Sequence, residues 1–158
     1  MRILFVNHNI SLWINVGLTY VMSAVAESHD VFLVDRMKHQ KNFDTYLLSA
    51  LAKINPHIIA LSVNSYTVNE ACMLARAVRS SFPDIIVVFG GVHPTIMPEE
   101  TIVLQDVDAI VVGEGELSFL EYANCLEERR EPYGVQGVWF KDKVGNIVRN
   151  PLRPFTED

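Results

Sequence analysis

Short runs of apolar residues recur along the chain and alternate with longer segments in which apolar residues lie at helical spacing. Each run holds four or five residues, and most runs are rich in β-branched side chains. Such runs are typical of strands that are covered on both faces of a sheet. The five predicted strands are Ile3–Val6, Val31–Val34, Ile58–Leu61, Ile85–Phe89 and Ala109–Val112.

Amphipathic helices are predicted between these runs, because Val16, Tyr20 and Val21 share one helical face and later segments repeat this spacing. Parallel strands need crossover connections, so this alternation predicts an α/β fold. We expect a doubly wound, five-stranded parallel sheet of the flavodoxin-like or Rossmann-like type, with helices on both faces. The helical segments begin at Asn15, Phe43, Thr67, Pro98 and Leu117 and end near Val25, Ile54, Ser81, Leu104 and Leu126.

Polar and glycine-containing segments follow four of the predicted strands. They cover residues 7–9, 62–65, 90–95 and 113–116. A doubly wound sheet binds its ligand outside the carboxyl ends of its strands. These four segments should therefore meet at that edge and form the functional site.

Two of the segments carry glycines at a strand end. Gly90 and Gly91 have no Cβ atoms and can adopt backbone angles closed to other residues, so a bulky group could lie directly on the main chain. Gly113 and Gly115 repeat the pattern one strand later, which suggests one floor for one ligand. Because Pro94 follows His93, we expect an extended backbone at His93 and a ligand contact from its ring or amide.

The end of the chain has a different pattern. Residues 137–141 and 147–149 flank a turn-forming segment that ends in Gly145-Asn146, which predicts a β-hairpin. Pro151 and Pro154 then lie in a stretch without periodicity, typical of a linker. We divide the chain into an α/β domain at residues 1–135 and a hairpin with linker at residues 136–158.

Composition narrows the class of partner. The chain has 158 residues, a net charge of −6 and no dense run of Lys and Arg, which disfavours nucleic acid as a ligand. No apolar run is long enough to span a membrane, and Met1–Val6 is too short and too strand-like for a signal peptide. Cys72 and Cys125 are too far apart for a disulfide framework or a zinc knuckle. We expect buried thiols in a cytoplasmic protein.

Common catalytic motifs are missing from the predicted edge. No phosphate-binding loop occurs, and no G-x-S-x-G motif surrounds Ser62 or Ser65. A phosphoacceptor domain would need acidic residues after the first strand and a lysine after the fifth. The carboxylates of Glu99 and Glu100 are explained by a favourable interaction with the start of a short helix. The edge is therefore predicted to bind a ligand, and we assign no catalytic residue.

Three stretches together identify a family resemblance. Residues 90–95 read Gly-Gly-Val-His-Pro-Thr, residues 98–100 read Pro-Glu-Glu, and residues 107–116 end in Gly-Glu-Gly-Glu. This combination resembles the cobalamin-binding amino-terminal domain of radical S-adenosylmethionine (SAM) enzymes. That group includes the anaerobic magnesium-protoporphyrin monomethyl ester oxidative cyclases and many methyltransferases. The resemblance covers essentially the whole chain.

The resemblance implies a corrinoid cofactor lying across the carboxyl edge, with its nucleotide tail running into the domain between the third and fourth strands. Ser62 would donate a hydrogen bond to the tail, and the glycines would give it room. The implied cofactor-binding residues are Ser62, Val63, Asn64, Gly90, Gly91, Val92, His93, Gly113, Glu114 and Gly115.

His8 is the one candidate cobalt ligand. Corrinoid domains of the methionine-synthase type carry D-x-H-x-x-G after the first strand, and residues 6–11 keep only its histidine. The aspartate that would orient the imidazole is replaced by Val6. Related radical enzymes bind cobalamin without this motif, with the base displaced from cobalt.

The chain lacks a C-x-x-x-C-x-x-C motif, so it cannot hold an iron-sulfur cluster of the radical SAM type. Cluster and SAM would belong to a carboxyl-terminal radical SAM domain of the same polypeptide, and this chain would position the cofactor. Two alternatives stay open: a fold that has lost the cofactor and serves as an interaction or substrate-docking domain, and a nucleotide-binding domain that uses the Gly113 loop.

Overall fold

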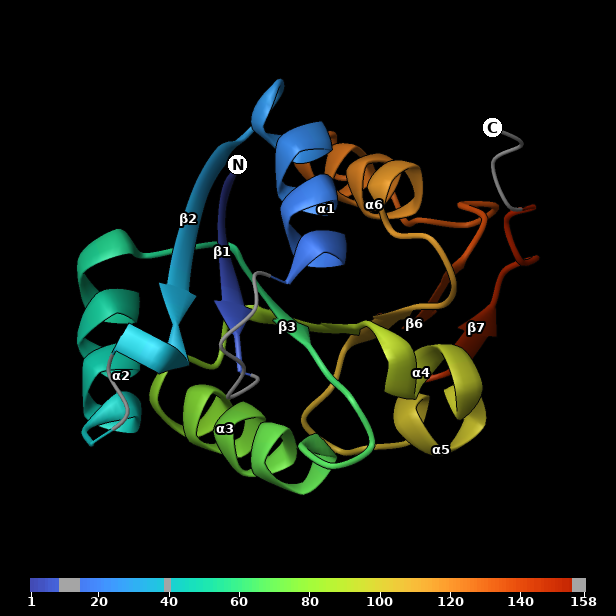
Figure 1. The fold of residues 1–158 in the computed structure, drawn as a ribbon. Helices are drawn as coiled ribbons and strands as arrows, with labels where there is room; N and C mark the ends of the chain where they lie inside the picture. The colour runs from blue at the N-terminus through green and yellow to red at the C-terminus, as the bar shows by residue number, and fades with distance from the viewer. Residues whose placement is uncertain (9–14, 39–40, 155–158) are drawn as a thin grey trace.

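A computed structural model describes residues 1–8, 15–38 and 41–154 (Figure 1). Within these residues the strands form one seven-stranded sheet in the order β2-β1-β3-β4-β5-β6-β7. Strands β1 to β5 are parallel, and β6 and β7 are antiparallel to their neighbours. The strands are β1 (Arg2–Asn7), β2 (Asp30–Asp35), β3 (Ile58–Ser62), β4 (Ile86–Gly90), β5 (Ala109–Val111), β6 (Val138–Lys141) and β7 (Ile147–Arg149).

Helices cover both faces of the sheet. Helices α1 and α6 lie side by side over one face, and α2 and α3 lie over the other (Figure 1). None of the helices in the described residues is long and apolar enough to cross a membrane. The helical elements are α1 (Val16–Ala26), η1 (Arg36–Lys38), α2 (Phe43–Ile54), α3 (Val68–Ser81), α4 (Val92–Ile96), α5 (Pro98–Ile102) and α6 (Glu116–Glu127).

Two hydrophobic cores lie on opposite faces of the sheet, because successive side chains of a strand point to opposite faces. In β1, Leu4 and Val6 pack into the core beneath α2 and α3, whereas Ile3 and Phe5 pack into the core beneath α1 and α6. The other central strands divide their side chains in the same way. The continuous apolar runs of the sequence are thus explained by burial on both faces.

The predicted elements are confirmed, with two differences. The hairpin continues the main sheet, since β6 pairs with β5 through Ile110 and Trp139, so the sheet has seven mixed strands in place of five parallel ones. The expected extended backbone at His93 is wrong, because Gly91 opens helix α4 at φ 98°. Pro94 fits in the first turn of α4, where a backbone N–H has no partner within the helix.

Hydrogen bonds hold the residues after the hairpin against the domain. The Trp139 indole donates to the Asn150 carbonyl at 3.1 Å, and the Gly137 amide donates to the Pro151 carbonyl at 2.8 Å. Arg153 donates to the Ser118 hydroxyl at the start of α6, at 3.1 Å. The division of the chain at residue 135 stays a prediction, and the segment that follows it packs against β5 and α6.

We predict that Gly137→Ala destabilises the domain by about 1 to 3 kcal/mol. Gly137 has φ 77°, and an added Cβ would lie 2.7 Å from the Ser118 hydroxyl and 3.2 Å from the Val112 carbonyl oxygen. Gly134→Ala is the matched control, because Gly134 has φ 82° with no atom within 4 Å of the added Cβ. Urea unfolding should show a larger loss for Gly137→Ala, and equal losses would contradict this role for close packing.

Candidate functional site

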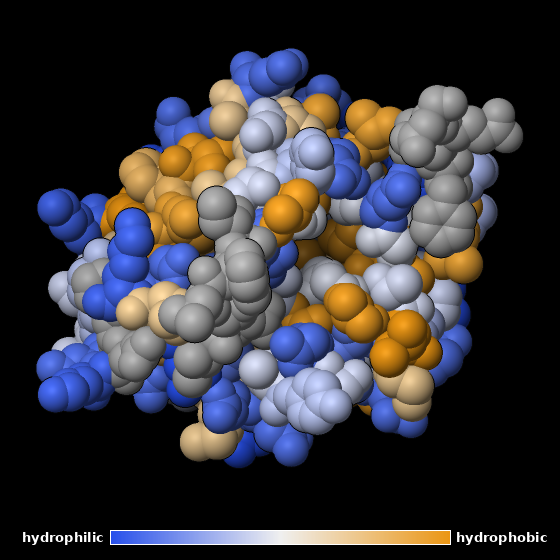
Figure 2. All heavy atoms as spheres, in the orientation of Figure 1, coloured by the Kyte–Doolittle hydropathy of each residue, from blue (hydrophilic) through white to orange (hydrophobic). Residues whose placement is uncertain are grey.

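A cavity of about 720 Å³ opens at the carboxyl edge of the parallel strands. The cavity lies on the face of the sheet that is covered by α1 and α6. In Figure 2 the surface is hollowed near its centre, and apolar residues lie inside the hollow. The segments predicted to meet at this edge do so. Their residues in the lining are Asn7, Ser62, Val63, Asn64, Gly90, Gly91, Val92, Thr95, Gly113, Glu114, Gly115 and Glu116.

The floor of the cavity consists of two rows of alternate strand residues. The inner row is apolar and contains Phe5, Ala60 and Val88, which are partners in register on β1, β3 and β4. The outer row lies two residues further along each strand, at the sheet edge. It contains Asn7, Ser62 and Gly90. Side-chain size falls along the outer row from Asn7 through Ser62 to Gly90, and Ala60 is the smallest residue of the inner row.

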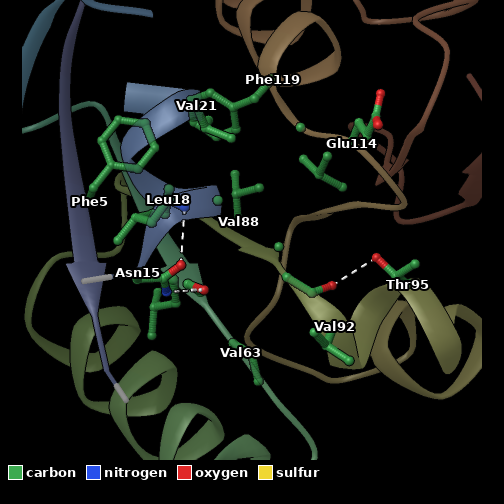
Figure 3. Close-up of a pocket in the computed structure, with 18 of the residues that line it drawn as sticks. Phe5, Asn15, Leu18, Val21, Val63, Val88, Val92, Thr95, Glu114 and Phe119 are labelled. Carbon is green, nitrogen blue, oxygen red and sulfur yellow. Dashed lines mark hydrogen bonds between the residues drawn. The ribbon is translucent and has the colours of Figure 1, made fainter. Parts of the chain in front are cut away.

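The walls come from the two helices over this face. Leu18 and Val21 of α1 face the cavity, and Phe119 of α6 lies next to Val21 at the top of the view (Figure 3). The Phe119 ring packs against the inner-row ring of Phe5, with a centroid distance of 5.3 Å. A Cβ at Gly115 would lie 2.9 Å from Val21, so a glycine is required where α6 begins beside α1. The inner part of the cavity is thus a narrow apolar space between sheet and helices.

One side chain fixes the start of α1 to the sheet. The Asn15 carbonyl oxygen accepts a hydrogen bond from the Leu18 amide at 3.1 Å and so caps the helix. The Asn15 amide nitrogen donates to the Ser62 hydroxyl at 2.9 Å (Figure 3). Both polar atoms of this asparagine are therefore satisfied, and α1 is held at the end of β3.

The two neighbouring glycines of the motif have different roles. At Gly90 an added Cβ would meet only Val111, at 3.9 Å, so Gly90 leaves space beside the cavity. At Gly91 an added Cβ would lie 2.9 Å from the Val63 carbonyl oxygen, and φ is 98°. Gly91 is thus required mainly by the close packing of its loop against the loop after β3.

Thr95 joins the two glycine segments. Its hydroxyl donates to the Gly91 carbonyl at 2.8 Å (Figure 3). The same hydroxyl accepts a hydrogen bond from the Gly113 amide at 3.0 Å. At Gly113, φ is 85° and an added Cβ would have no atom within 4 Å, so this residue leaves open space. The glycine segments after β4 and β5 therefore form one continuous border, as their sequence spacing predicted.

His93 lies behind the cavity and is not one of its lining residues. It is 9% exposed, and its Nδ1 lies 3.1 Å from the Ser65 hydroxyl. Its backbone amide donates to the Val63 carbonyl at 3.0 Å. The neighbouring residue Val92 is 62% exposed and does line the cavity.

His8 lies beside the core on the opposite face of β1. The side chain is 3% exposed, and its ring packs against Phe43. Its Nε2 lies 3.2 Å from Nη1 of Arg36 and 3.3 Å from Oε2 of Glu70. Burial, and secondly the Arg36 charge, lower the pKa of His8 below its usual value. Since a guanidinium only donates, Nε2 of the neutral ring is the acceptor. No group of three His, Cys, Asp or Glu residues among the described positions could hold a metal ion.

Several lining residues were not predicted from the sequence. In the sequence, Ala60 and Val88 look like ordinary core residues. Each lies two residues before a predicted edge residue, Ser62 or Gly90, and therefore on the same face of the sheet. Only this spacing could have indicated the cavity. Asn15 was recognised as a helix start, but its bond to Ser62 joins residues 47 positions apart. Thr95 belonged to one of the predicted edge segments, but its hydrogen bonds to Gly91 and Gly113 were not predicted.

Comparisons with known sequences agree with this geometry. The sequence profile of the B12-binding domain matches residues 6–123. The chain is 32% identical to an uncharacterized methyltransferase of Pyrococcus horikoshii over 143 residues, which are 90% of this chain and 31% of that protein. It is 28% identical to the anaerobic magnesium-protoporphyrin IX monomethyl ester cyclase of Rubrivivax gelatinosus, over 82% of this chain and 24% of that protein.

Solved structures share the fold. The radical SAM methyltransferase TsrM from Kitasatospora setae, with cobalamin and a [4Fe-4S] cluster bound, superposes with a TM-score of 0.85 at 23% identity, over 99% of this chain and 30% of that one. The cobalamin-dependent SAM radical enzyme OxsB, with aqua-cobalamin and SAM bound, superposes with a TM-score of 0.82 at 20% identity, over 98% of this chain and 22% of that one.

The chain therefore spans between about a fifth and a third of these relatives. The family profile covers the end of β1, strands β2 to β5, α1, the glycine segments and most of α6, so the match includes all the cavity-lining residues except Phe5. From the profile match together with the cavity at the carboxyl edge, we conclude that this chain belongs to the B12-binding domain family and is a cobalamin-binding module.

Proposed function

We propose that this chain positions cobalamin within a cobalamin-dependent radical SAM enzyme, and that a further domain of the same polypeptide carries the radical chemistry. The observation that supports this most is the cavity between the sheet and helices α1 and α6. Cobalamin consists of a broad corrin ring and a nucleotide tail that ends in a flat aromatic base. When bound, the cofactor supplies the chemistry of its cobalt.

The lining fits the tail of this cofactor. The apolar residues Ala60, Val88 and Phe119 surround a space suited to a flat, apolar base. The outer row adds the Ser62 hydroxyl and the side-chain-free Gly90, which suit the sugar and phosphate of a nucleotide tail. We propose that these residues hold the tail and that the corrin ring lies over the sheet edge outside the cavity.

The alternatives from the sequence are less well supported. For a pyrophosphate at the start of α6, the carboxylates of Glu114 and Glu116 would lie where the helix dipole should favour an anion. An interaction domain that had lost its cofactor would be expected to fill the unused space with side chains. The hollow between Ala60 and Phe119 favours a retained ligand.

His8 is a poor candidate for the cobalt ligand. It does not line the cavity, and its Nε2 accepts a hydrogen bond from Arg36 on the other face of β1. Ligation through that nitrogen would break this bond and would leave the Arg36–Glu70 pair rearranged. We propose that this chain binds cobalamin without using His8 as a ligand.

The parent activity is proposed only at the level of class. The curated relatives include a methyltransferase and cyclases, and this chain covers less than a third of each. Because the sequence has no C-x-x-x-C-x-x-C motif, SAM and the iron-sulfur cluster would bind outside these residues. A cytoplasmic location stays a prediction.

We predict that the purified chain binds hydroxocobalamin, and that Ala60→Leu weakens this binding by about tenfold or more. The larger side chain would occupy the space proposed for the nucleotide base. Because Ala60 borders a cavity, the apo domain should keep its stability. Visible spectroscopy during titration and co-elution on gel filtration would measure binding, and urea unfolding would measure stability.

Ala26→Leu is the matched control, since Ala26 is exposed near the end of α1 and should bind as the wild type does. A wild-type chain that neither shifts the spectrum nor co-elutes would refute cobalamin binding. Wild-type affinity in Ala60→Leu would refute the placement of the tail in this cavity.

We predict that replacing His8 with Ala or Gln leaves the visible spectrum of the bound cobalamin unchanged. The reason is that His8 Nε2 accepts a hydrogen bond from Arg36, which is itself paired with Glu70, away from the cavity. A spectral shift in both variants at saturating cofactor would identify His8 as a ligand. The Gln variant is included because it keeps a polar side chain at this buried position.

We also predict that His8 makes the apo domain less stable in acid. The pKa of His8 in the folded state is lowered from 6.5, so the unfolded state binds more protons as the pH falls. This contribution to stability is complete above about pH 6.5 and is lost toward the lower folded-state pKa, with a slope of at most about 1.4 kcal/mol per pH unit. Urea unfolding between pH 7.5 and 5.5 should give a flatter profile for His8→Gln, whereas an identical slope would contradict the assignment.

A further inference from the structure

Asn7, the last residue of β1, faces the cavity. Strand alternation places Asn7 on the same side as Ile3 and Phe5, and the residue is only 5% exposed. It pairs in register with Ser62, and both residues line the cavity at its outer row. Asn7 is thus a polar group held between the apolar interior of the cavity and the sheet edge.

The side-chain oxygen of Asn7 has no hydrogen-bond partner within the part of the chain that the structure describes, although it is shielded from solvent. Buried acceptors are almost always paired, because leaving one unpaired is destabilising. Asn15, which lines the same cavity, uses both of its amide atoms within the protein. The Nδ1 of His8 is also unpaired, but His8 lies on the opposite face of β1. Asn7 is therefore an acceptor that lacks its donor at the edge of the cavity.

We infer that Asn7 is a cofactor-binding residue whose side-chain oxygen accepts a hydrogen bond from an amide N–H of the corrin ring. This inference rests on the proposed function. The corrin ring carries several primary amides at its periphery, and these are neutral donors. A phosphate offers only acceptors, which an acceptor oxygen would repel. Asn7 belongs to the outer row, at the edge where the ring is proposed to lie.

The test is to compare Asn7→Leu with Asn15→Leu, which alter the same residue type in the same cavity. Asn7→Leu removes the unpaired acceptor at similar volume, so the apo domain should unfold at the same or a higher urea concentration than the wild type. Its affinity for hydroxocobalamin should fall about three- to tenfold, as expected for one lost hydrogen bond. Asn15→Leu breaks two bonds within the protein and should lower both stability and affinity.

A second titration uses cobinamide, which keeps the corrin amides and lacks the nucleotide. Asn7→Leu should weaken cobinamide binding by the same factor as cobalamin binding. Loss for cobalamin alone would place the donor on the ribose hydroxyls and overturn the assignment to a corrin amide.

Two further outcomes would overturn the inference. Unchanged affinity in Asn7→Leu while the wild type binds normally would remove Asn7 from the site and leave the proposed function intact. A parallel loss of stability and affinity, as in Asn15→Leu, would show that Asn7 is structural. If the wild type binds no hydroxocobalamin at all, the proposed function is refuted. The proposed hydrogen bond between Asn7 and a corrin amide is then refuted as well.

Discussion

The alternation of side chains along the parallel strands is the constraint on which this structure depends. Each central strand must fill a core beneath α2 and α3 with one set of residues, while the other set borders a hollow beneath α1 and α6. In β3 these sets are Ile59 and Leu61 on the filled side and Ala60 and Ser62 on the hollow side. A slip of one residue would exchange them, so the fold and the binding site require the same register.

An apolar cavity of this size costs stability, because its lining loses the dispersion contacts of a packed core. The structure compensates at the borders of the hollow. Asn15 holds the start of α1 to β3, Thr95 ties the loop after β4 to the loop after β5, and Arg153 reaches the start of α6. A ligand that fills the hollow binds only the folded state and so stabilises it by mass action. Cofactor binding and domain stability are thereby coupled through the same contacts.

The sequence was sufficient to predict the strands, the helices between them other than α4, and the edge at which the glycine segments meet, because all of these follow from local periodicity and turn chemistry. It was not sufficient for features that depend on which face of the sheet a side chain points to, or on contacts between residues far apart in the sequence. Ala60 has the same local pattern as a core residue, and only its register with Phe5 and Val88 reveals a cavity. The pairing of β6 with β5 depends on the hairpin folding back onto the sheet, which no local pattern specifies. His93 was expected to be extended because of Pro94, but the first turn of α4 tolerates the proline.

The end of β1 shows how closely binding chemistry depends on the face of the sheet to which each side chain points. Asn7 and His8 are neighbours in sequence, yet the pleat directs them to opposite faces of the sheet. The histidine is the more familiar candidate for a cobalt site, but its ring is held by Arg36 and Glu70 beside the packed core. The asparagine belongs to no familiar binding motif, but it lines the cavity and its side-chain oxygen has no partner among the residues that the structure describes. Residue type alone points to His8. The direction of the side chain from the strand and the missing hydrogen bond point instead to Asn7, because an unsatisfied acceptor is tolerated where a ligand supplies its donor.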